Sequence, residues 1–89
     1  MFDWDDTNTD HVRRHGIEPN DVEEALTDPR RLSVAAYTTA GEARRGVLGA
    51  TSAGRVLIVV ITKRAGRTRV ITAYDADRAE KKRYRTRGK

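Results

Sequence analysis

The chain has 89 residues, no cysteine and a formal net charge of +5. A chain of this length buries only about two thirds of its surface on folding, so we expect one small domain over residues 1–89. Without cysteine it can form neither disulfides nor a thiolate metal site, which favours a reducing compartment, the cytoplasm.

The sequence gives no sign of export or membrane insertion. Residues 1–6 are acidic, whereas a secretion signal needs a basic start and a long apolar region. The longest strongly apolar run, Val56 to Ile61, is far shorter than the roughly 20 residues that a membrane-spanning helix requires. The sequence therefore predicts a soluble cytoplasmic protein with no membrane partner.

Charge is divided unevenly along the chain. The segment up to Asp28 contains nine carboxylates and only two arginines, Arg13 and Arg14, so its formal net charge is −7. The segment from Pro29 onward contains sixteen Lys and Arg and four carboxylates, so its formal net charge is +12. A basic segment of this density attracts phosphate backbones, because each neutralised phosphate releases condensed counterions. Nucleic acid is therefore the partner that the composition indicates.

The acidic N-terminal segment predicts two helices. Helix-compatible residues run from about Asp5 to His15, end in a basic turn that suits the negative end of the helix dipole, and stop at Gly16. Pro19 fits the first position of a second helix, which Pro29 ends. We expect Trp4, flanked by aspartates, to fill the core and keep one edge in water.

Beyond these helices the pattern changes to that of strands. Four are predicted: Leu32 to Thr38, Arg44 to Ala50, Val56 to Ile61 and Arg67 to Tyr74. Turns are expected at Ala40-Gly41 and Ala65-Gly66. Val56 to Ile61 lacks alternation, which is typical of a central strand covered on both faces.

A last helix is expected through about Tyr84, capped by Asp75 or Asp77, before a frayed basic tail at Arg85 to Lys89. Two N-terminal helices, a meander of four strands and a C-terminal helix predict an α+β fold with a four-stranded antiparallel sheet.

Several short motifs occur together in one order: Phe2-Asp3-Trp4-Asp5, Arg14-His15-Gly16, Asp28-Pro29 and Arg69-Val70-Ile71-Thr72-Ala73, then Glu80 and Tyr84. In this the chain resembles the BrnT toxins of bacterial type II toxin–antitoxin systems. The resemblance implies a RelE-like fold and a metal-independent endoribonuclease that needs no cofactor, cleaves RNA and arrests growth. It also implies neutralisation by a BrnA-type antitoxin, whose DNA-binding segment can bring the complex to operator DNA.

Cutting RNA without a metal requires the 2′-hydroxyl to lose a proton, the phosphorane to be stabilised and the leaving oxygen to gain a proton. Cations on neighbouring strands can stabilise the phosphorane, and we expect a cluster of them to converge: Arg44, Arg45, Lys63, Arg64, Arg67 and Arg69. The family places arginines at Arg44 and Arg69, which we expect to bind the phosphate, with the other four binding RNA around it. The alternative is a solvated charged face.

Tyr74 departs from the family pattern, because Thr72-Ala73-Tyr74 stands where the family commonly has Ser-Ala-Arg. Tyr74 can stack on a base or donate a proton, but an unperturbed tyrosine pKa of about 10 makes it a poor base. A catalytically weakened or inactive module that binds RNA or an antitoxin is therefore the alternative function. Tyr84 can stack on RNA or pack the last helix onto the sheet.

The two histidines, His11 and His15, stand four residues apart on one helical face. This spacing can chelate zinc, but no third ligand from Cys or His is evident, so no metal is expected. His15 can transfer protons in catalysis, because histidine titrates near neutral pH and the family shares the His-Gly pair, or it can cap its helix. A DNA-binding regulator is a third interpretation, although the chain lacks a helix–turn–helix pattern.

Overall fold

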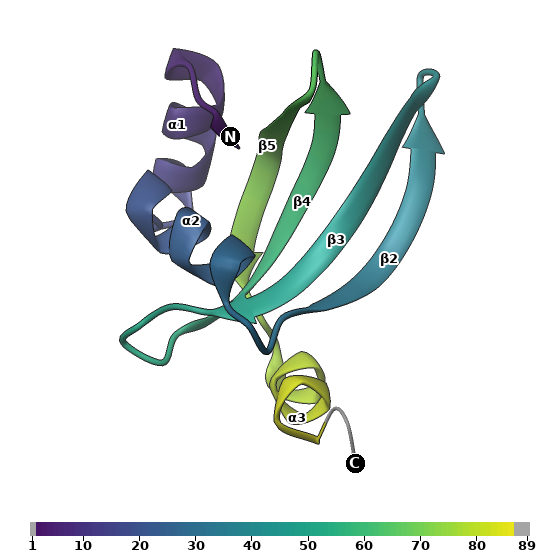
Figure 1. The fold of residues 1–89 in the computed structure, drawn as a ribbon. Coiled ribbons are helices and arrows are strands. Elements are labelled where there is room, and N and C mark those ends of the chain that lie inside the picture. The colour runs from purple at the N-terminus through teal and green to yellow at the C-terminus, as the bar shows by residue number, and fades with distance from the viewer. Residues whose placement is uncertain (1, 87–89) are drawn as a thin grey trace.

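A five-stranded sheet lies at the centre of the molecule, with three helices packed against it (Figure 1). The computed structural model describes residues 2–86. The helices are α1 (Asp6–Arg14), α2 (Pro19–Thr27) and α3 (Arg78–Thr86). The strands are β1 (Phe2–Asp3), β2 (Leu32–Thr39), β3 (Glu42–Ala50), β4 (Val56–Arg64) and β5 (Arg67–Asp75), arranged across the sheet as β1-β5-β4-β3-β2.

The prediction of an α+β fold is confirmed, but the prediction of a purely antiparallel four-stranded sheet is wrong. β2 to β5 form the expected antiparallel meander, and β1 adds a fifth strand parallel to β5. Phe2 pairs with Thr68, and Asp3 pairs with Arg69. A strand of two residues shows no periodicity in sequence, and it forms here because the edge of β5 has unpaired backbone groups.

Side-chain caps fix where the helices begin. Asp5 and Asn8 form a capping box on α1, since each accepts the backbone N–H of the other, at 3.1 and 2.8 Å. Asp77 and Glu80 form the same arrangement before α3, with both N···O distances 2.8 Å. The three predicted helices are therefore confirmed within about two residues at each end, and Asp77 rather than Asp75 caps the last one.

The two predicted turns close two tight hairpins. Ala40 and Gly41 have φ of 51° and 78°, and Ala65 and Gly66 have φ of 50° and 76°. Two successive left-handed residues match the twist of antiparallel strands, and glycine adopts this conformation without a steric penalty. The flanking strands run further into the turns than predicted: β3 begins at Glu42 and β4 continues to Arg64.

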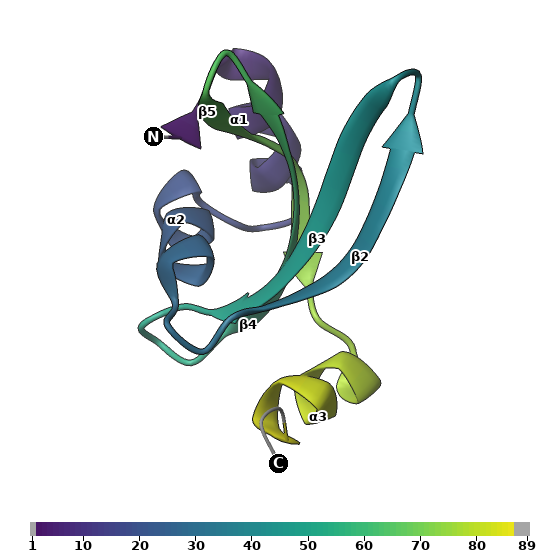
Figure 2. The ribbon, with the colours of Figure 1, turned by 45° about the vertical axis from the view of Figure 1, so that its right-hand side comes forward.

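The two faces of the sheet carry separate cores. On one face, α1 and α2 cover a large cluster that includes Val47, Leu57, Val59 and Val70. On the other face, a smaller cluster of Leu48, Val56, Ile58 and Ala76 lies under α3. Figure 2 shows α1 and α2 on one side of the sheet and α3 on the other. Val56 to Ile61 is buried along its whole length, which confirms the prediction of a strand covered on both faces.

Polar contacts complete the packing. Trp4 packs against the larger cluster and donates its indole N–H to a Glu23 carboxylate oxygen at 2.8 Å, as expected of a core residue with a polar edge. The Arg55 guanidinium binds both carboxylate oxygens of Asp75, at 2.7 and 2.9 Å, and the Gly16 carbonyl. One arginine of the basic segment is therefore part of the structural framework.

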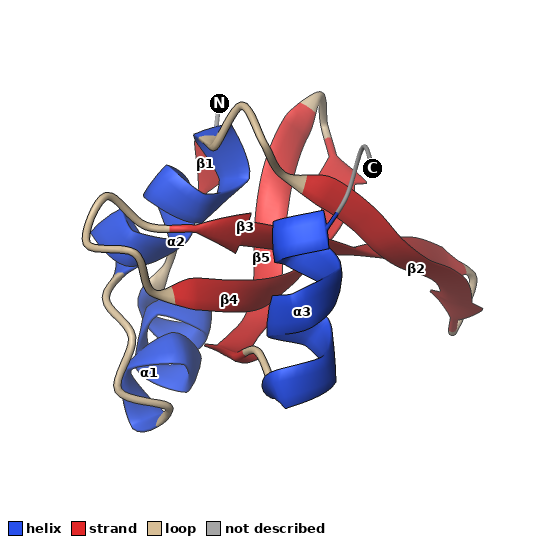
Figure 3. Cartoon of the chain, turned by 90° about the horizontal axis from the view of Figure 1, so that it is seen from below, coloured by secondary structure: helices blue, strands red, loops and turns tan. Residues whose placement is uncertain are grey.

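The last helix crosses the sheet near the ends of β3 and β4, as the view from below shows (Figure 3). The Tyr84 hydroxyl donates to Asp28, whose carboxylate also accepts the Ala50 backbone N–H at 2.9 Å. Arg85 and Thr86 belong to α3, so the predicted frayed tail is wrong at those two positions, and residues 87–89 lie outside the described part. No helix in residues 2–86 is long and apolar enough to cross a membrane.

Candidate functional site

We call the face of the sheet on which α3 lies the open face, because α3 covers only part of it (Figure 2). Even-numbered residues of β3 and β4, such as Leu48 and Ile58, belong to this face. Because side chains alternate along a strand, Arg44 and Arg64 project from the same face. Two of the expected cations therefore lie on the less covered side of the sheet.

A β-bulge decides the position of Arg69. Val59 pairs with Ala73, but Ile61 pairs with Val70, so β5 has one additional residue in this interval. The extra residue shifts the alternation of side chains, so residues beyond the bulge lie on the opposite face from the one that simple alternation would give. Val70 and Ala73 consequently both face the larger core, and Arg69 comes to the open face with Thr62 as its cross-strand partner.

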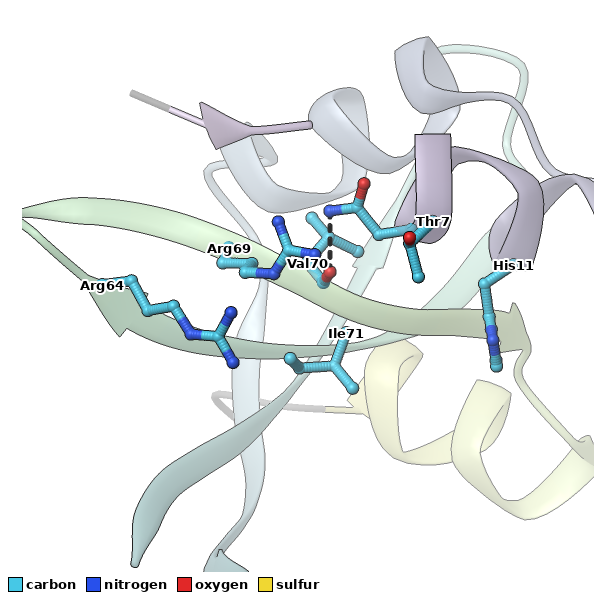
Figure 4. Close-up of a pocket in the computed structure, with 7 residues that line it drawn as sticks. Thr7, His11, Arg64, Arg69, Val70 and Ile71 are labelled. Atoms are coloured by element: carbon cyan, nitrogen blue, oxygen red, sulfur yellow. Dashed lines mark hydrogen bonds between the residues drawn. The ribbon is translucent and has the colours of Figure 1, made fainter. Parts of the chain in front are cut away.

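Arg64 and Arg69 line a surface hollow of about 170 Å³ at the β5 edge of the sheet. Thr7 and His11 of α1 form the opposite wall, and Ile71 lies between Arg64 and His11 in the view of Figure 4. Asn8 holds α1 in position, because its amide donates to the Val70 carbonyl at 3.0 Å. The hollow thus brings together two guanidinium groups, an imidazole and a hydroxyl from three different elements.

Carboxylates already neutralise Arg69. Its side chain is only 12% exposed and pairs with Asp5 at 2.9 Å and with Asp3 at 3.4 Å. The pKa of Asp5 is held below its ordinary value, first by the Asn8 backbone N–H and then by Arg69. These contacts fix the Arg69 guanidinium beside the hollow, and an incoming phosphate would compete with the two carboxylates for it.

Glu42 joins the other two arginines of the open face. One of its oxygens accepts from Arg44 Nε at 3.1 Å, and the other accepts from Arg64 at 2.9 to 3.0 Å. Arg64 and Arg44 together lower the pKa of Glu42, with Arg64 the larger cause. Two cations and one anion leave a net positive charge, so the cluster can still attract a phosphate.

The remaining expected cations are divided between the two faces. Arg67 is the cross-strand partner of Arg64 and lies at the β4–β5 turn. Arg45 pairs with Ile61, and Lys63 pairs with Thr68, which places both on the face that carries the larger core. The six cations therefore do not converge on one site as the sequence had suggested.

The histidines differ in position. His15 is the exposed C-cap of α1, where its backbone N–H donates to the Val12 carbonyl, whereas His11 lines the hollow on the side opposite Arg64 and Arg69. In the sequence, His11 stands out only through its zinc-compatible spacing from His15, although its position one helical turn after Thr7 also places both residues on one face of α1. The two rings are 5.5 Å apart, and no group of three or more potential metal ligands occurs in residues 2–86.

Tyr84 and Tyr74, the two tyrosines considered for RNA contact, lie in different surroundings. Tyr84 packs against the smaller core and hydrogen-bonds to Asp28, which matches the packing role considered for it. Tyr74 is 39% exposed on the open face. Burial and the nearby Glu80 carboxylate raise the pKa of Tyr74 above its ordinary value, so its phenol stays protonated at neutral pH and is less available as a base than a free tyrosine.

Together these features define a small α+β protein with a cationic surface site that joins guanidinium groups to an imidazole. A family model described as the ribonuclease toxin BrnT of type II toxin–antitoxin systems matches residues 4–80. The chain therefore belongs to the BrnT family of ribonuclease toxins. This membership implies an antitoxin protein as partner and RNA as substrate. No curated protein matches the chain closely enough to count as a relative.

Proposed function

We propose that this chain is a metal-independent endoribonuclease toxin that cuts RNA at the hollow between α1 and β5. The observation that carries the proposal is that His11, Arg64 and Arg69 line one hollow in a chain of a ribonuclease toxin family. Cleavage arrests growth. A BrnA-type antitoxin neutralises the toxin, and it can carry the toxin–antitoxin complex to operator DNA. The antiparallel meander between N- and C-terminal helices supports a RelE-like classification.

Each group has one task in the proposed reaction. Arg64 and Arg69 bind the scissile phosphate and stabilise the charge that develops on it, with forked donors suited to phosphate oxygens. His11 accepts the proton of the 2′-hydroxyl, since imidazole can exchange a proton near neutral pH. The 2′-oxygen then attacks the phosphorus to form a 2′,3′-cyclic phosphate, and water protonates the 5′-oxygen that leaves. We assign this step to His11 rather than His15, because His11 lines the hollow. Arg44, which shares Glu42 with Arg64, binds a neighbouring phosphate.

Purified protein incubated with a long single-stranded RNA, with and without EDTA, tests this proposal. We expect cleavage that EDTA does not reduce, and a loss of roughly 10²-fold to 10⁴-fold in His11→Ala. Arg64→Ala should lose cleavage as well. Arg14→Ala is the matched control, because Arg14 is an exposed arginine at the end of α1 and does not line the hollow.

Two results would contradict the assignment. Cleavage by His11→Ala and Arg64→Ala at the rate of the unchanged protein would remove the hollow as the active site. Loss of cleavage in EDTA, restored by added metal, would remove the metal-independent mechanism. Expression of the unchanged chain, with and without its antitoxin, tests growth arrest and neutralisation separately from these points.

A catalytically weakened module that binds RNA or an antitoxin is the second candidate. Two observations favour it: Asp3 and Asp5 compete for Arg69, and Tyr74 occupies the position where the family commonly has arginine. Under this alternative, Tyr74→Arg should increase cleavage of RNA. An unchanged rate in Tyr74→Arg would remove the argument that rests on Tyr74.

A further inference from the structure

A second depression lies on the open face, between the exposed side of the sheet and α3. We call it the tyrosine groove. Tyr37 of β2 and Tyr74 of β5 border it, Gly46 and Val60 form part of its floor, and Glu80 and Arg83 of α3 contribute one wall. Its volume is about 260 Å³. The hollow of His11, Arg64 and Arg69 does not use these residues.

Its two tyrosines are unusual in their exposure. Tyr37 is 45% exposed and Tyr74 is 39% exposed, and they are the large apolar side chains that lie exposed within residues 2–86. They come from strands separated by β3 and β4, yet they border one depression. A small domain does not need two exposed aromatic rings beside one groove for its own stability, so the arrangement indicates a ligand with flat apolar faces.

The charges around the groove indicate which ligand this is. Arg44 is the cross-strand partner of Tyr37, and Arg83 lies on the α3 wall, so cations stand on both sides. Glu80 lies on the same α3 wall as Arg83 and repels phosphate, but its carboxylate can accept hydrogen bonds from the N–H groups of a base. The groove therefore suits the base side of a nucleic acid strand, with the phosphates at its borders.

The floor of the groove is apolar. The Val34 side chain fills the space over Gly46, since a Cβ at Gly46 would lie 3.0 Å from Val34 Cγ2, and Val60 lines the groove beside them. The pKa of Tyr74 is raised, first by its burial and then by Glu80 and Tyr37, so its ring carries no charge at neutral pH. Neutral aromatic rings stack on bases of any sequence, since every base has a π face.

We propose that Tyr37 and Tyr74 stack neighbouring bases of single-stranded RNA and so hold the strand across the open face. The inference rests on the proposed ribonuclease function and extends it, because Tyr74 and Arg69 both lie on β5, about 15 Å apart along the strand. A strand whose bases rest in the tyrosine groove can place a neighbouring phosphate at the hollow. The groove thus selects unpaired RNA, since the bases of a duplex are already stacked.

Binding of a short fluorescent oligonucleotide of 2′-O-methyl RNA tests the proposal. This RNA has no free 2′-hydroxyl, so it measures binding without cleavage. The comparison strand is abasic, with the same length and the same number of phosphates. We expect Tyr37→Ala and Tyr74→Ala each to weaken binding of the base-containing strand about tenfold, and to leave binding of the abasic strand unchanged. Tyr37→Phe and Tyr74→Phe should bind as the unchanged protein does.

The outcomes separate this inference from the proposed function. Tyrosine variants that bind both strands like the unchanged protein, or that lose both equally, would overturn the stacking role. Base-dependent binding that the alanine variants lose, together with failure to cut natural RNA, would support stacking and count against catalysis. Thermal unfolding of each variant shows whether a loss of binding arises from a loss of folded protein.

Discussion

The two faces of the sheet are built for different purposes. The face under α1 and α2 carries the large core, in which Leu57, Val59 and Val70 are fully buried. The open face has a smaller core, and it leaves Tyr37 and Tyr74 exposed beside a chain of charged groups. Stability therefore depends mainly on one face, and ligand contacts can change on the other at little cost to folding.

The largest expected effect comes from a methyl group on the helix-covered face. A Cβ at Gly49 would lie 2.2 Å from the Ala25 backbone carbonyl oxygen, so α2 would have to move away from β3. We expect Gly49→Ala to destabilise the protein by about 3 kcal/mol or more. Gly46→Ala on the open face approaches the Val34 side chain at 3.0 Å and meets Ala35 only at ordinary contact distance, so it should cost about 1 kcal/mol. Urea unfolding measures both, and equal costs would contradict the comparison.

The contact of α1 with β5 should be the next most sensitive. The buried Asn8 amide donates to the Asp3 carbonyl at 2.9 Å and to the Val70 carbonyl at 3.0 Å. Asn8→Asp replaces this donor with a carboxylate oxygen and should cost about 2 to 3 kcal/mol at neutral pH. Part of the loss should return in acid, where the new carboxyl can be protonated and donate again. Equal losses at pH 4 and pH 7 would contradict this explanation.

A smaller effect is expected where α3 meets the sheet. Tyr84→Phe keeps the ring against the smaller core and removes the hydroxyl that donates to Asp28. We expect a loss of about 1 kcal/mol in unfolding free energy. Tyr37→Phe, a matched change at an exposed ring, should alter stability by less than about 0.5 kcal/mol. Thermal or urea unfolding of Tyr84→Phe and Tyr37→Phe measures both effects. An unchanged unfolding free energy in both variants would contradict the role of the Tyr84 hydroxyl.

The smallest expected effect is a pH dependence from Asp5. The pKa of Asp5 is lowered in the folded protein from an ordinary value of 3.8, by the Asn8 N–H and by Arg69. Its stabilising contribution is therefore complete above about pH 4 and is lost as the pH falls through the lower folded-state pKa. Asp5→Asn should flatten the decline of the melting temperature in acid. Asp10→Asn, at an exposed position of α1, is the control and should leave that decline unchanged.

Local chemistry made most of the fold predictable. Asp5, Pro19 and Asp77 mark helix starts through capping and backbone preferences, and the two Ala-Gly turns mark the hairpins. β1 could not be predicted, because it depends on pairing across the length of the chain rather than on its own two residues. The sequence also placed β3 and β4 correctly and erred only where they enter the turns.

The site was less predictable than the fold. The bulge in β5 determines which face Arg69 occupies, and no residue near Ile71 signals a bulge in the sequence. In a regular strand without this bulge, Arg69 would lie on the same face as Ala73 and so among the core side chains. The choice between His11 and His15 likewise depends on how α1 meets β5, which is a tertiary contact. The sequence indicated the residue types, and long-range packing decided their neighbours.

The contact between Asp3 and Arg69 joins positions 66 residues apart in the sequence. During synthesis, the helices and the β2–β3 hairpin emerge before the strand that carries Arg69, and contacts this distant form only after the intervening chain exists. A growing chain therefore has no complete hollow until β5 has left the ribosome. In the proposed toxin, the ability to damage RNA would appear only near the end of its own translation.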